Sequence, residues 1–237
     1  MAPQIPGMPE PPEPDPGQGA HGSQPWYSRG DDIAFAHIAL AADAGGLTHA
    51  SVHLRHYLDN SGTDLKIDPD QIMHDDPGLK RLVDQIMTVT LQDIAGDPAS
   101  YSKSVPFQLL PWQGYTFDKN GQPDWYLAIG SIHVTTSGIV TVHPQDAAGA
   151  QPRVTVDYQI HLSDRYNWDG LKQTKIAGVK VTDARMGALH TAGLAQEFNM
   201  LGSSTIKHYE GVVPTNGAID LPNGSDSRDG TRTDPGR

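Results

Sequence analysis

The stretch Val154-Thr155-Val156-Asp157-Tyr158-Gln159-Ile160-His161-Leu162 alternates apolar and polar residues, and Asp164-Arg165-Tyr166-Asn167-Trp168-Asp169-Gly170-Leu171-Lys172 follows it closely. Such alternation is typical of a β-strand with one buried face. The strand therefore delivers two carboxylates, a phenol, an amide, an indole and a lysine into one short turn. No other segment combines so much chemistry with so much aromatic area, so this corner is the candidate site.

Further apolar runs before and after this strand predict an antiparallel sheet. The Asn-Gly pair in Asp118-Lys119-Asn120-Gly121 is typical of a hairpin turn, and Ser137-Gly138 predicts another tight connection. The expected strands are Phe107–Leu110, Gly114–Phe117, Trp125–Thr135, Ile139–His143, Val154–Leu162 and Thr174–Val181.

Helices are predicted mainly before the sheet. Asp68-Pro69 and Asp76-Pro77 each place an N-cap carboxylate before a proline at the first helical position. The expected helices are Ile33–Asp43, Thr48–Leu58, Asp70–His74 and Gly78–Ile94, with a short one that Thr182 or Asp183 caps and Gly193 ends.

These elements predict an α+β fold within one domain, residues 26–213. A helical lobe (26–96) packs on an antiparallel β-meander or partly open barrel (105–213). Eight prolines fall within residues 1–25, so this end is expected to be a disordered acidic arm in which nothing can be buried. Residues 214–237 are rich in Gly, Ser, Asp and Pro and are expected to form a second disordered tail.

Composition excludes several classes of protein. The 237 residues carry a net charge of −11 without a basic cluster, which argues against a nucleic-acid partner. The absence of cysteine excludes thiolate zinc sites, disulfides and thiol catalysis. No apolar run approaches the roughly 20 residues of a membrane span, so we expect a soluble protein. The start shows no signal peptide, so export would need a specialised secretion system.

The corner supports two interpretations. Asp164 and Asp169 could converge across the turn, either as a general acid and base or as ligands of a divalent cation, Ca²⁺ or Mg²⁺. Lys172 would then hold a phosphate oxygen, and Tyr166 and Trp168 would wall the ligand. In the alternative, Asp164 accepts backbone amides in a turn and the aromatic residues plug the end of the sheet.

Other polar groups could contribute to metal sites or to catalysis. Oxygens of Asp59, Asn60, Ser61 and Asp64 could wrap a calcium ion, although the spacing is not that of an EF-hand. His49 and His53 stand at zinc-ligand spacing on a predicted helix that offers no acidic third ligand. His161 and His190 lie on the elements that enter and leave the corner, so either could reach it.

The order of features resembles C-terminal toxin domains of bacterial polymorphic and secreted effector proteins. In chain order, the features are a helical N-terminal part, then the segment Trp125–Ser131, then a strand that ends in Asp164–Asp169, and finally the segment Leu189–Phe198. The strand with its Asp-x-Tyr piece is similar to the colicin M group, which cleaves the pyrophosphate-linked cell-wall precursor lipid II in a partly open β-barrel with a helical part. Asp164 and Tyr166 match that family's Asp and Tyr. Asn167 replaces its second Asp, and Gln173-Thr174 occupy the place of its His-Arg pair.

The resulting leading hypothesis is an antibacterial toxin-like effector that hydrolyses a phosphorylated cell-envelope precursor with a divalent cation. Asp164, Tyr166, Asn167 and Lys172 would be catalytic, and Asp164, Asp169, Asp59 and Asp64 would hold the cation. An immunity or secretion partner protein would accompany such an effector. The alternative is a non-catalytic binding or structural protein, a secreted partner or particle component, with a structural aromatic corner. A third hypothesis is a zinc hydrolase that uses His49 and His53.

Overall fold

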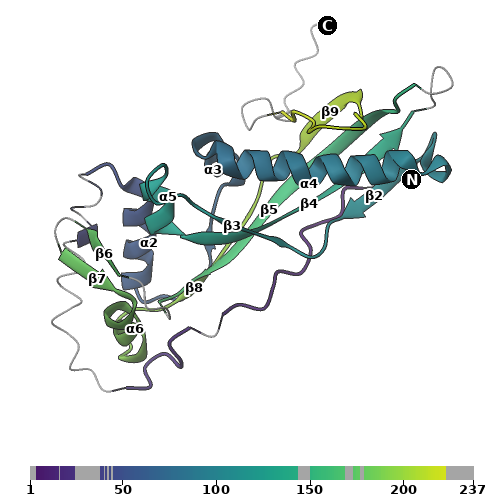
Figure 1. The fold of residues 1–237 in the computed structure, drawn as a ribbon. Coiled ribbons are helices and arrows are strands. Elements are labelled where there is room, and N and C mark those ends of the chain that lie inside the picture. The colour runs from purple at the N-terminus through teal and green to yellow at the C-terminus, as the bar shows by residue number, and fades with distance from the viewer. Residues whose placement is uncertain are drawn as a thin grey trace, which may run out of the picture.

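The computed structural model of the chain describes residues 4–15, 17–24, 38–39, 41, 43, 45–143, 150–168, 173–176 and 179–222. A seven-stranded sheet, a two-stranded hairpin and the helices around them give the predicted α+β fold (Figure 1). The helices are α2 (Thr48–Leu58), α3 (Pro69–Asp75), α4 (Pro77–Gly96), α5 (Pro123–Ala128) and α6 (Asp183–Thr191). The strands are β1 (Leu65–Lys66), β2 (Ser104–Gln108), β3 (Gln113–Thr116), β4 (Ser131–Val142), β5 (Arg153–Tyr166), β6 (Gln173–Ile176), β7 (Val179–Thr182), β8 (Phe198–Ser203) and β9 (Lys207–Val212).

The sheet is built around β4 and β5, which pair antiparallel from His133–Ser163 to Val142–Val154. The strand order is β1-β8-β5-β4-β2, with β3 also paired to β4 and β9 also paired to β5. The pairs are antiparallel, except that β1 runs parallel to β8. The described sheet is therefore mixed, and it does not close into a barrel.

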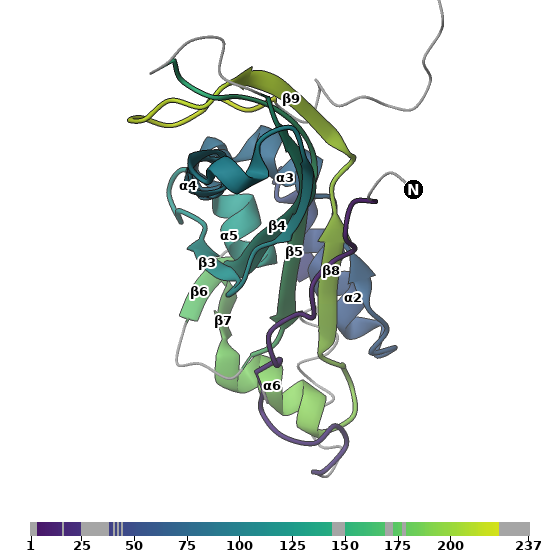
Figure 2. The same cartoon turned by 90° about the vertical axis from the view of Figure 1, so that its right-hand side faces the viewer.

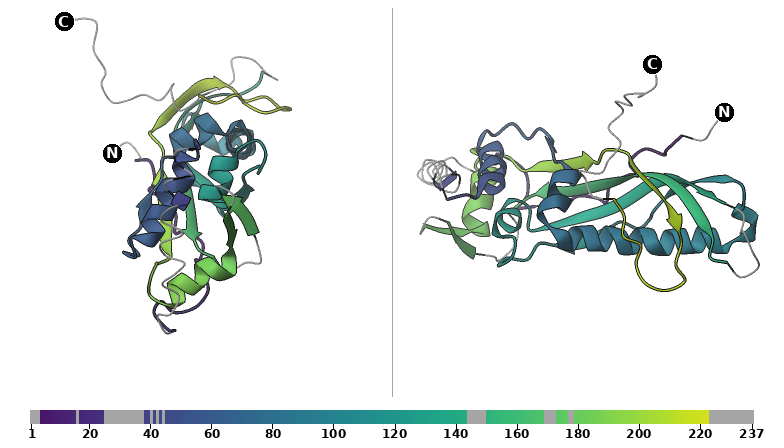
Figure 3. Two further views of the ribbon diagram at one scale, coloured as in Figure 1. Left: turned by 90° about the vertical axis from the view of Figure 1, so that its left-hand side faces the viewer. Right: turned by 90° about the horizontal axis from the view of Figure 1, so that it is seen from above.

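Helix α4 lies lengthwise on one face of the sheet (Figure 3). Leu79, Val83, Met87 and Leu91 recur every four residues along it and are buried. This spacing forms one apolar stripe, and burial of each such side chain stabilises the fold by about 1.5–3 kcal/mol. Within the described residues, no helix is long and apolar enough to cross a membrane.

The helix starts follow the local capping rules. The Asp68 carboxylate accepts the backbone N–H groups of Asp70 and Gln71 at the start of α3. The Asp76 carboxylate accepts the N–H of Gly78 at the start of α4. The bounds of α2 match the prediction, and Thr182 caps α6 as expected. The predicted helix Ile33–Asp43 lies mostly outside the described residues.

The prediction of a strand over Trp125–Thr135 is wrong in its first half, which forms α5. Pro123 opens this helix, and Gly130, with φ +81°, turns the chain into β4 only at Ser131. The Asp124 carboxylate accepts the N–H groups of His49 (3.0 Å) and Ala50 (2.8 Å), so α5 supplies the N-terminal cap of α2. A tertiary contact thus favours the helix where the apolar run alone indicated a strand.

Two further strand predictions are corrected. Ser137-Gly138 is not a turn but the middle of β4. A Cβ at Gly138 would lie 2.6 Å from the Asp157 carbonyl oxygen and 2.7 Å from the Phe107 ring, so glycine is needed there for close packing rather than for a turn. The predicted strand Thr174–Val181 is a hairpin of β6 and β7.

Both predicted tails contribute more to the fold than their composition indicated. The N-terminal arm lies on the face of the sheet opposite α4 and runs toward α6 (Figure 2). Pro9 is buried there, so the expectation that the arm buries nothing is wrong. The expected boundary at residue 214 is also wrong, because Ile219 and Leu221 are buried and Ile219 N–H donates to Thr88 Oγ1 on α4 (2.8 Å).

Candidate functional site

At the corner that ends β5, the strand is no longer paired with β4 and remains paired with β8 alone. The pairing of β4 with β5 ends at His133 and Ser163, whereas β8 remains paired with β5 through Tyr166. From Asp164 onward, the edge of β5 that would face β4 borders a cavity instead. The end of the strand and the two residues after it, 163–168, therefore line this cavity.

The cavity has a volume of about 860 Å³. Most of its wall comes from three segments: the N-terminal arm (10–15), the end of α5 with the start of β4 (126–131), and the end of β5 with the two residues after it (163–168). The remaining lining residues are Thr116, His133, Gln173, Val181, Asp183, Asn199 and Leu201. The volume falls within the range of roughly 300–1,000 Å³ that is typical of small-molecule sites.

The lining combines apolar and polar groups. Tyr126, Leu127, Ile129 and Leu201 contribute apolar and aromatic surface, and Trp168 adds an indole. The polar groups are Ser131, His133, Ser163, Asp164, Asn167 and Asp183. A cavity of this composition suits a ligand with an apolar part and a polar or charged part.

Carboxylates dominate the charges of the described lining. They are Glu10, Glu13, Asp15, Asp164 and Asp183, against the single guanidinium of Arg165. This excess of negative charge favours cations and repels a bare phosphate. A phosphorylated ligand would bind here more readily together with a cation that offsets its charge.

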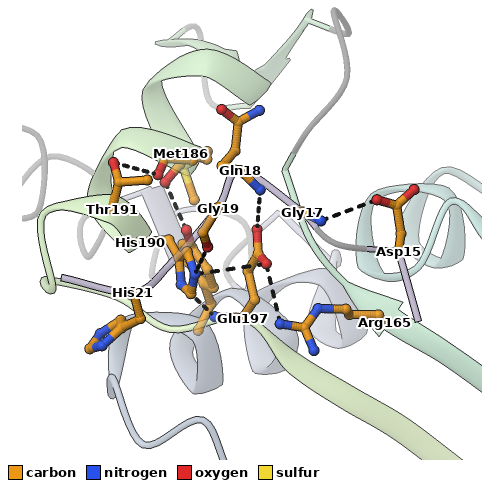
Figure 4. Close-up of polar contacts among 12 residues, drawn as sticks. Asp15, Gly17, Gln18, Gly19, His21, Arg165, Met186, His190, Thr191 and Glu197 are labelled. Atoms are coloured by element: carbon orange, nitrogen blue, oxygen red, sulfur yellow. Dashed lines mark hydrogen bonds and ion pairs between the residues drawn. The ribbon is translucent and has the colours of Figure 1, made fainter. Parts of the chain in front are cut away.

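Arg165 is tied to a buried acid beside the cavity (Figure 4). Its Nη2 donates to Oε2 of Glu197 (3.4 Å), and its Nη1 donates to Oδ1 of Asn199 (3.4 Å), the residue opposite it in the β5–β8 ladder. The Glu197 side chain is fully buried, so its charge requires a partner. The guanidinium thus neutralises Glu197 first and is only partly available to a ligand.

Tyr166 and Trp168 pack as the structural interpretation expected. Tyr166 is buried, and its ring stacks on Phe198 with centroids 4.9 Å apart. Trp168 meets Tyr166 edge to face at 5.5 Å and is half-buried. Burial raises the pKa of the Tyr166 phenol well above its usual range, so this group keeps its proton near neutral pH.

The predicted site residues divide into three groups. Asp164, Tyr166 and Asn167 line the cavity. Asp169 and Lys172 lie outside the described residues. Asp59 and Asp64 are exposed and do not line the cavity. Asp64 Oδ1 accepts a hydrogen bond from Asn199 (3.1 Å), and Asn199 is one of the residues that line the cavity.

The proposed calcium loop has other partners. Asn60, with φ +58°, donates from Nδ2 to the Gly193 carbonyl (2.9 Å) and accepts at Oδ1 from His21 Nε2 (2.8 Å). Ser61 and Thr63 bond to each other at 3.0 Å. Among the described residues, no group of three His, Asp or Glu side chains is arranged to hold a metal.

The two histidines considered for zinc turn to different partners. His49 stacks on Trp125 with centroids 3.8 Å apart, and its Nε2 lies 3.7 Å from Asp75. His53 donates from Nδ1 to the His49 carbonyl (2.8 Å), which leaves Nε2 as a buried lone pair without a partner among the described residues. Burial lowers the pKa of His53 from 6.5 to about 4, so its ring stays neutral at physiological pH.

Several cavity residues could not be recognised from the sequence. His133, Asn199 and the arm residues Glu10–Asp15 come from segments far from the Asp164 corner. Only the register of β4 and β8 on β5 and the path of the arm bring them together. His161 and His190 were considered as catalytic residues. His161 instead bonds Ser137 and Ser203, and His190 bonds the Gly19 carbonyl of the arm.

Comparisons of the chain with protein-family models, with curated proteins and with solved structures find no match. The resemblance of the Asp164–Tyr166 motif to the colicin M group therefore stays a prediction from the sequence.

Proposed function

We propose that the chain is a toxin-like hydrolase that acts on a phosphorylated amphiphile of the cell envelope, such as a lipid-linked pyrophosphate precursor, in the cavity at the end of β5. The observation that carries the proposal is the position of Asp164. Asp164 lines a cavity of about 860 Å³ that has both an apolar and a polar lining. A lipid-linked phosphate has the same two parts.

A divalent cation would suit this cavity. Mg²⁺ is commonly bound by one or two carboxylates together with substrate phosphates, so a complete protein cage is not required. Asp164 and Asp183 line the same cavity and are the candidate ligands within the described wall. When bound, the cation would neutralise phosphate charge and lower the pKa of a bound water.

The remaining polar residues have positioning roles in this proposal. The amide of Asn167 and the hydroxyls of Ser131 and Ser163 can bond phosphate oxygens from the cavity wall. The exposed imidazole of His133 is the candidate proton acceptor for an attacking water. Tyr166 shapes the site through its packed ring, because its raised pKa keeps the phenol protonated and unable to accept a proton near neutral pH.

Expression of the chain in the periplasm of a bacterial host tests this proposal. The wild-type chain should slow growth or lyse the cells, and Asp164→Asn should relieve this effect without loss of folding. Asp93→Asn is the matched control, because Asp93 is an exposed carboxylate on α4 away from the cavity lining. A harmless wild-type chain, or equal toxicity of the Asp164→Asn variant, would reject the toxin function.

A non-catalytic binding function is the second candidate. The specific observation in its favour is that Tyr166 and Trp168 pack against each other and against the core, as in a structural corner. Under this proposal the cavity holds a ligand or a partner segment without chemical change. Binding of a lipid phosphate that returns intact after long incubation would favour it over the hydrolase.

A further inference from the structure

We infer that residues 4–15 and 17–24 belong to a releasable strap that covers one side of the cavity and is fixed at both ends. The strap runs along the face of the sheet opposite α4 (Figure 2). Its middle segment, Glu10–Asp15, forms one side of the cavity. The inference concerns access to the cavity and holds whether the ligand is hydrolysed or only bound.

The first anchor holds carbonyl groups of the strap. Ser137 Oγ donates to the Pro6 carbonyl (2.7 Å), Gln108 Nε2 donates to the Gly7 carbonyl (2.9 Å), and Trp112 Nε1 donates to the Glu10 carbonyl (3.0 Å). Proline lacks an N–H group but keeps a carbonyl acceptor, so a proline-rich segment can be held in this way.

A buried histidine sets the direction of the hydrogen bond at Ser137. The Ser137 hydroxyl donates its proton to Pro6, so its oxygen accepts from Nε2 of His161 (2.9 Å). Nδ1 of that neutral ring then accepts from the Ser203 hydroxyl (2.8 Å). Burial lowers the pKa of His161 to about 4, which keeps the ring neutral and the row of hydrogen bonds intact.

The second anchor lies beside α6 (Figure 4). The buried Glu197 carboxylate accepts the backbone N–H of Gln18 (3.5 Å), and His190 Nε2 donates to the Gly19 carbonyl (3.1 Å). Two backbone N–H groups of the strap donate to α6, Gly22 to His190 O (3.1 Å) and Gln24 to Thr191 O (2.7 Å).

Gly17 makes this second anchor sensitive to substitution. Its φ is +67°, and a Cβ there would lie 2.1 Å from Glu197 Oε2. Glu197 cannot move aside easily, because Arg165 and Gln18 both bond its buried carboxylate. An alanine at position 17 therefore has to displace the strap or break the Glu197 contacts.

Between the anchors the strap is rich in proline. Pro11, Pro12 and Pro14 have no N–H to donate, and proline-rich chain is stiff and extended. A stiff segment held at its ends moves as a unit when either end is released. Release of one anchor therefore uncovers the cavity.

The native chain has no cysteine, so a single engineered thiol can report access to the cavity. Ser163 lines the cavity and is 6% exposed. In the Ser163→Cys chain, maleimide labelling should be slow. Adding either Ser137→Ala or Gly17→Ala should speed it by roughly fivefold or more, the effect of losing about one net hydrogen bond.

Two controls isolate the strap from general unfolding. Gly7→Ala should leave the Ser163→Cys labelling rate unchanged, because a Cβ at Gly7 meets no atom within 4 Å. A separate Ser51→Cys reporter, fully buried in α2, should stay protected in every variant. Equal rates with and without the anchor substitutions would overturn the inference, as would equal acceleration at both reporters. Neither labelling result depends on hydrolysis, so the proposed function is tested separately.

Discussion

Tyr166 stacks on Phe198, its direct partner across the β5–β8 ladder, with ring centroids 4.9 Å apart and ring planes 12° apart. Both rings are buried, and Tyr57 approaches the Tyr166 ring from α2 at 5.7 Å. The residue that the sequence motif placed among the catalytic groups is therefore part of the core beside the cavity. Its neighbour in the motif, Asp164, keeps a position on the cavity wall.

This packing predicts different effects for two substitutions of Tyr166. Tyr166→Ala should lower the free energy of unfolding by about 3–5 kcal/mol, because it removes a large buried ring. Tyr166→Phe should change it by less than about 1.5 kcal/mol and leave ligand binding intact, since the ring shape is kept. Denaturant titration of both variants measures the difference. A folded Tyr166→Phe chain without function would show that the hydroxyl acts chemically.

The ion pair of Lys207 and Asp70 offers a second test. Nζ and Oδ1 lie 2.6 Å apart without the alignment of a good hydrogen bond, and the Lys207 side chain is only 1% exposed. Lys207→Ala should cost about 3–5 kcal/mol in unfolding free energy, because it leaves a largely buried carboxylate without its cation. Arg153→Ala, which breaks the exposed pair with Glu210, is the control and should cost less than about 1 kcal/mol. Similar losses in the two variants would contradict the burial argument.

The buried histidines predict a pH dependence of stability. Because folding lowers the pKa of His53 from 6.5 to about 4, the unfolded chain binds one more proton between these values. Stability should therefore fall as the pH drops from about 6.5 toward 4, by up to about 3 kcal/mol from this residue. His53→Phe should reduce the slope of unfolding free energy against pH by about 1 kcal/mol per pH unit. His74→Gln, which replaces a histidine at an exposed position, is the matched control. An unaltered slope in His53→Phe would mean that the buried ring is not the titrating group.

Local rules predicted part of this fold. The Asp-Pro starts of α3 and α4 depend on contacts within three residues, so the sequence was sufficient there. Helix α5 was missed because its helical state depends on Asp124 capping a distant helix and on Trp125 bonding Asp75. A short apolar run carries neither signal.

The candidate site, like the fold, could be predicted only in part from the sequence. The crowding of polar groups after a strand pointed to Asp164 and Asn167, and both line the cavity. The composition of the arm argued against burial, because its eight prolines provide no amide donors and it has few large apolar side chains. Its carbonyls are instead bonded by donors such as Ser137 and Trp112, more than a hundred residues away in the sequence.

The most direct test of the account is hydrolysis of a lipid-linked pyrophosphate precursor by the purified chain. The intact protein and the Gly17→Ala variant would each be incubated with the precursor and Mg²⁺ or Ca²⁺, with a chelator as control, and the products identified by mass spectrometry. We predict release of the phosphorylated head group, faster in Gly17→Ala, suppressed by the chelator and slowed roughly 100-fold or more by Asp164→Asn. Intact precursor in every reaction, or equal rates with and without the Asp164 carboxylate, would contradict the account.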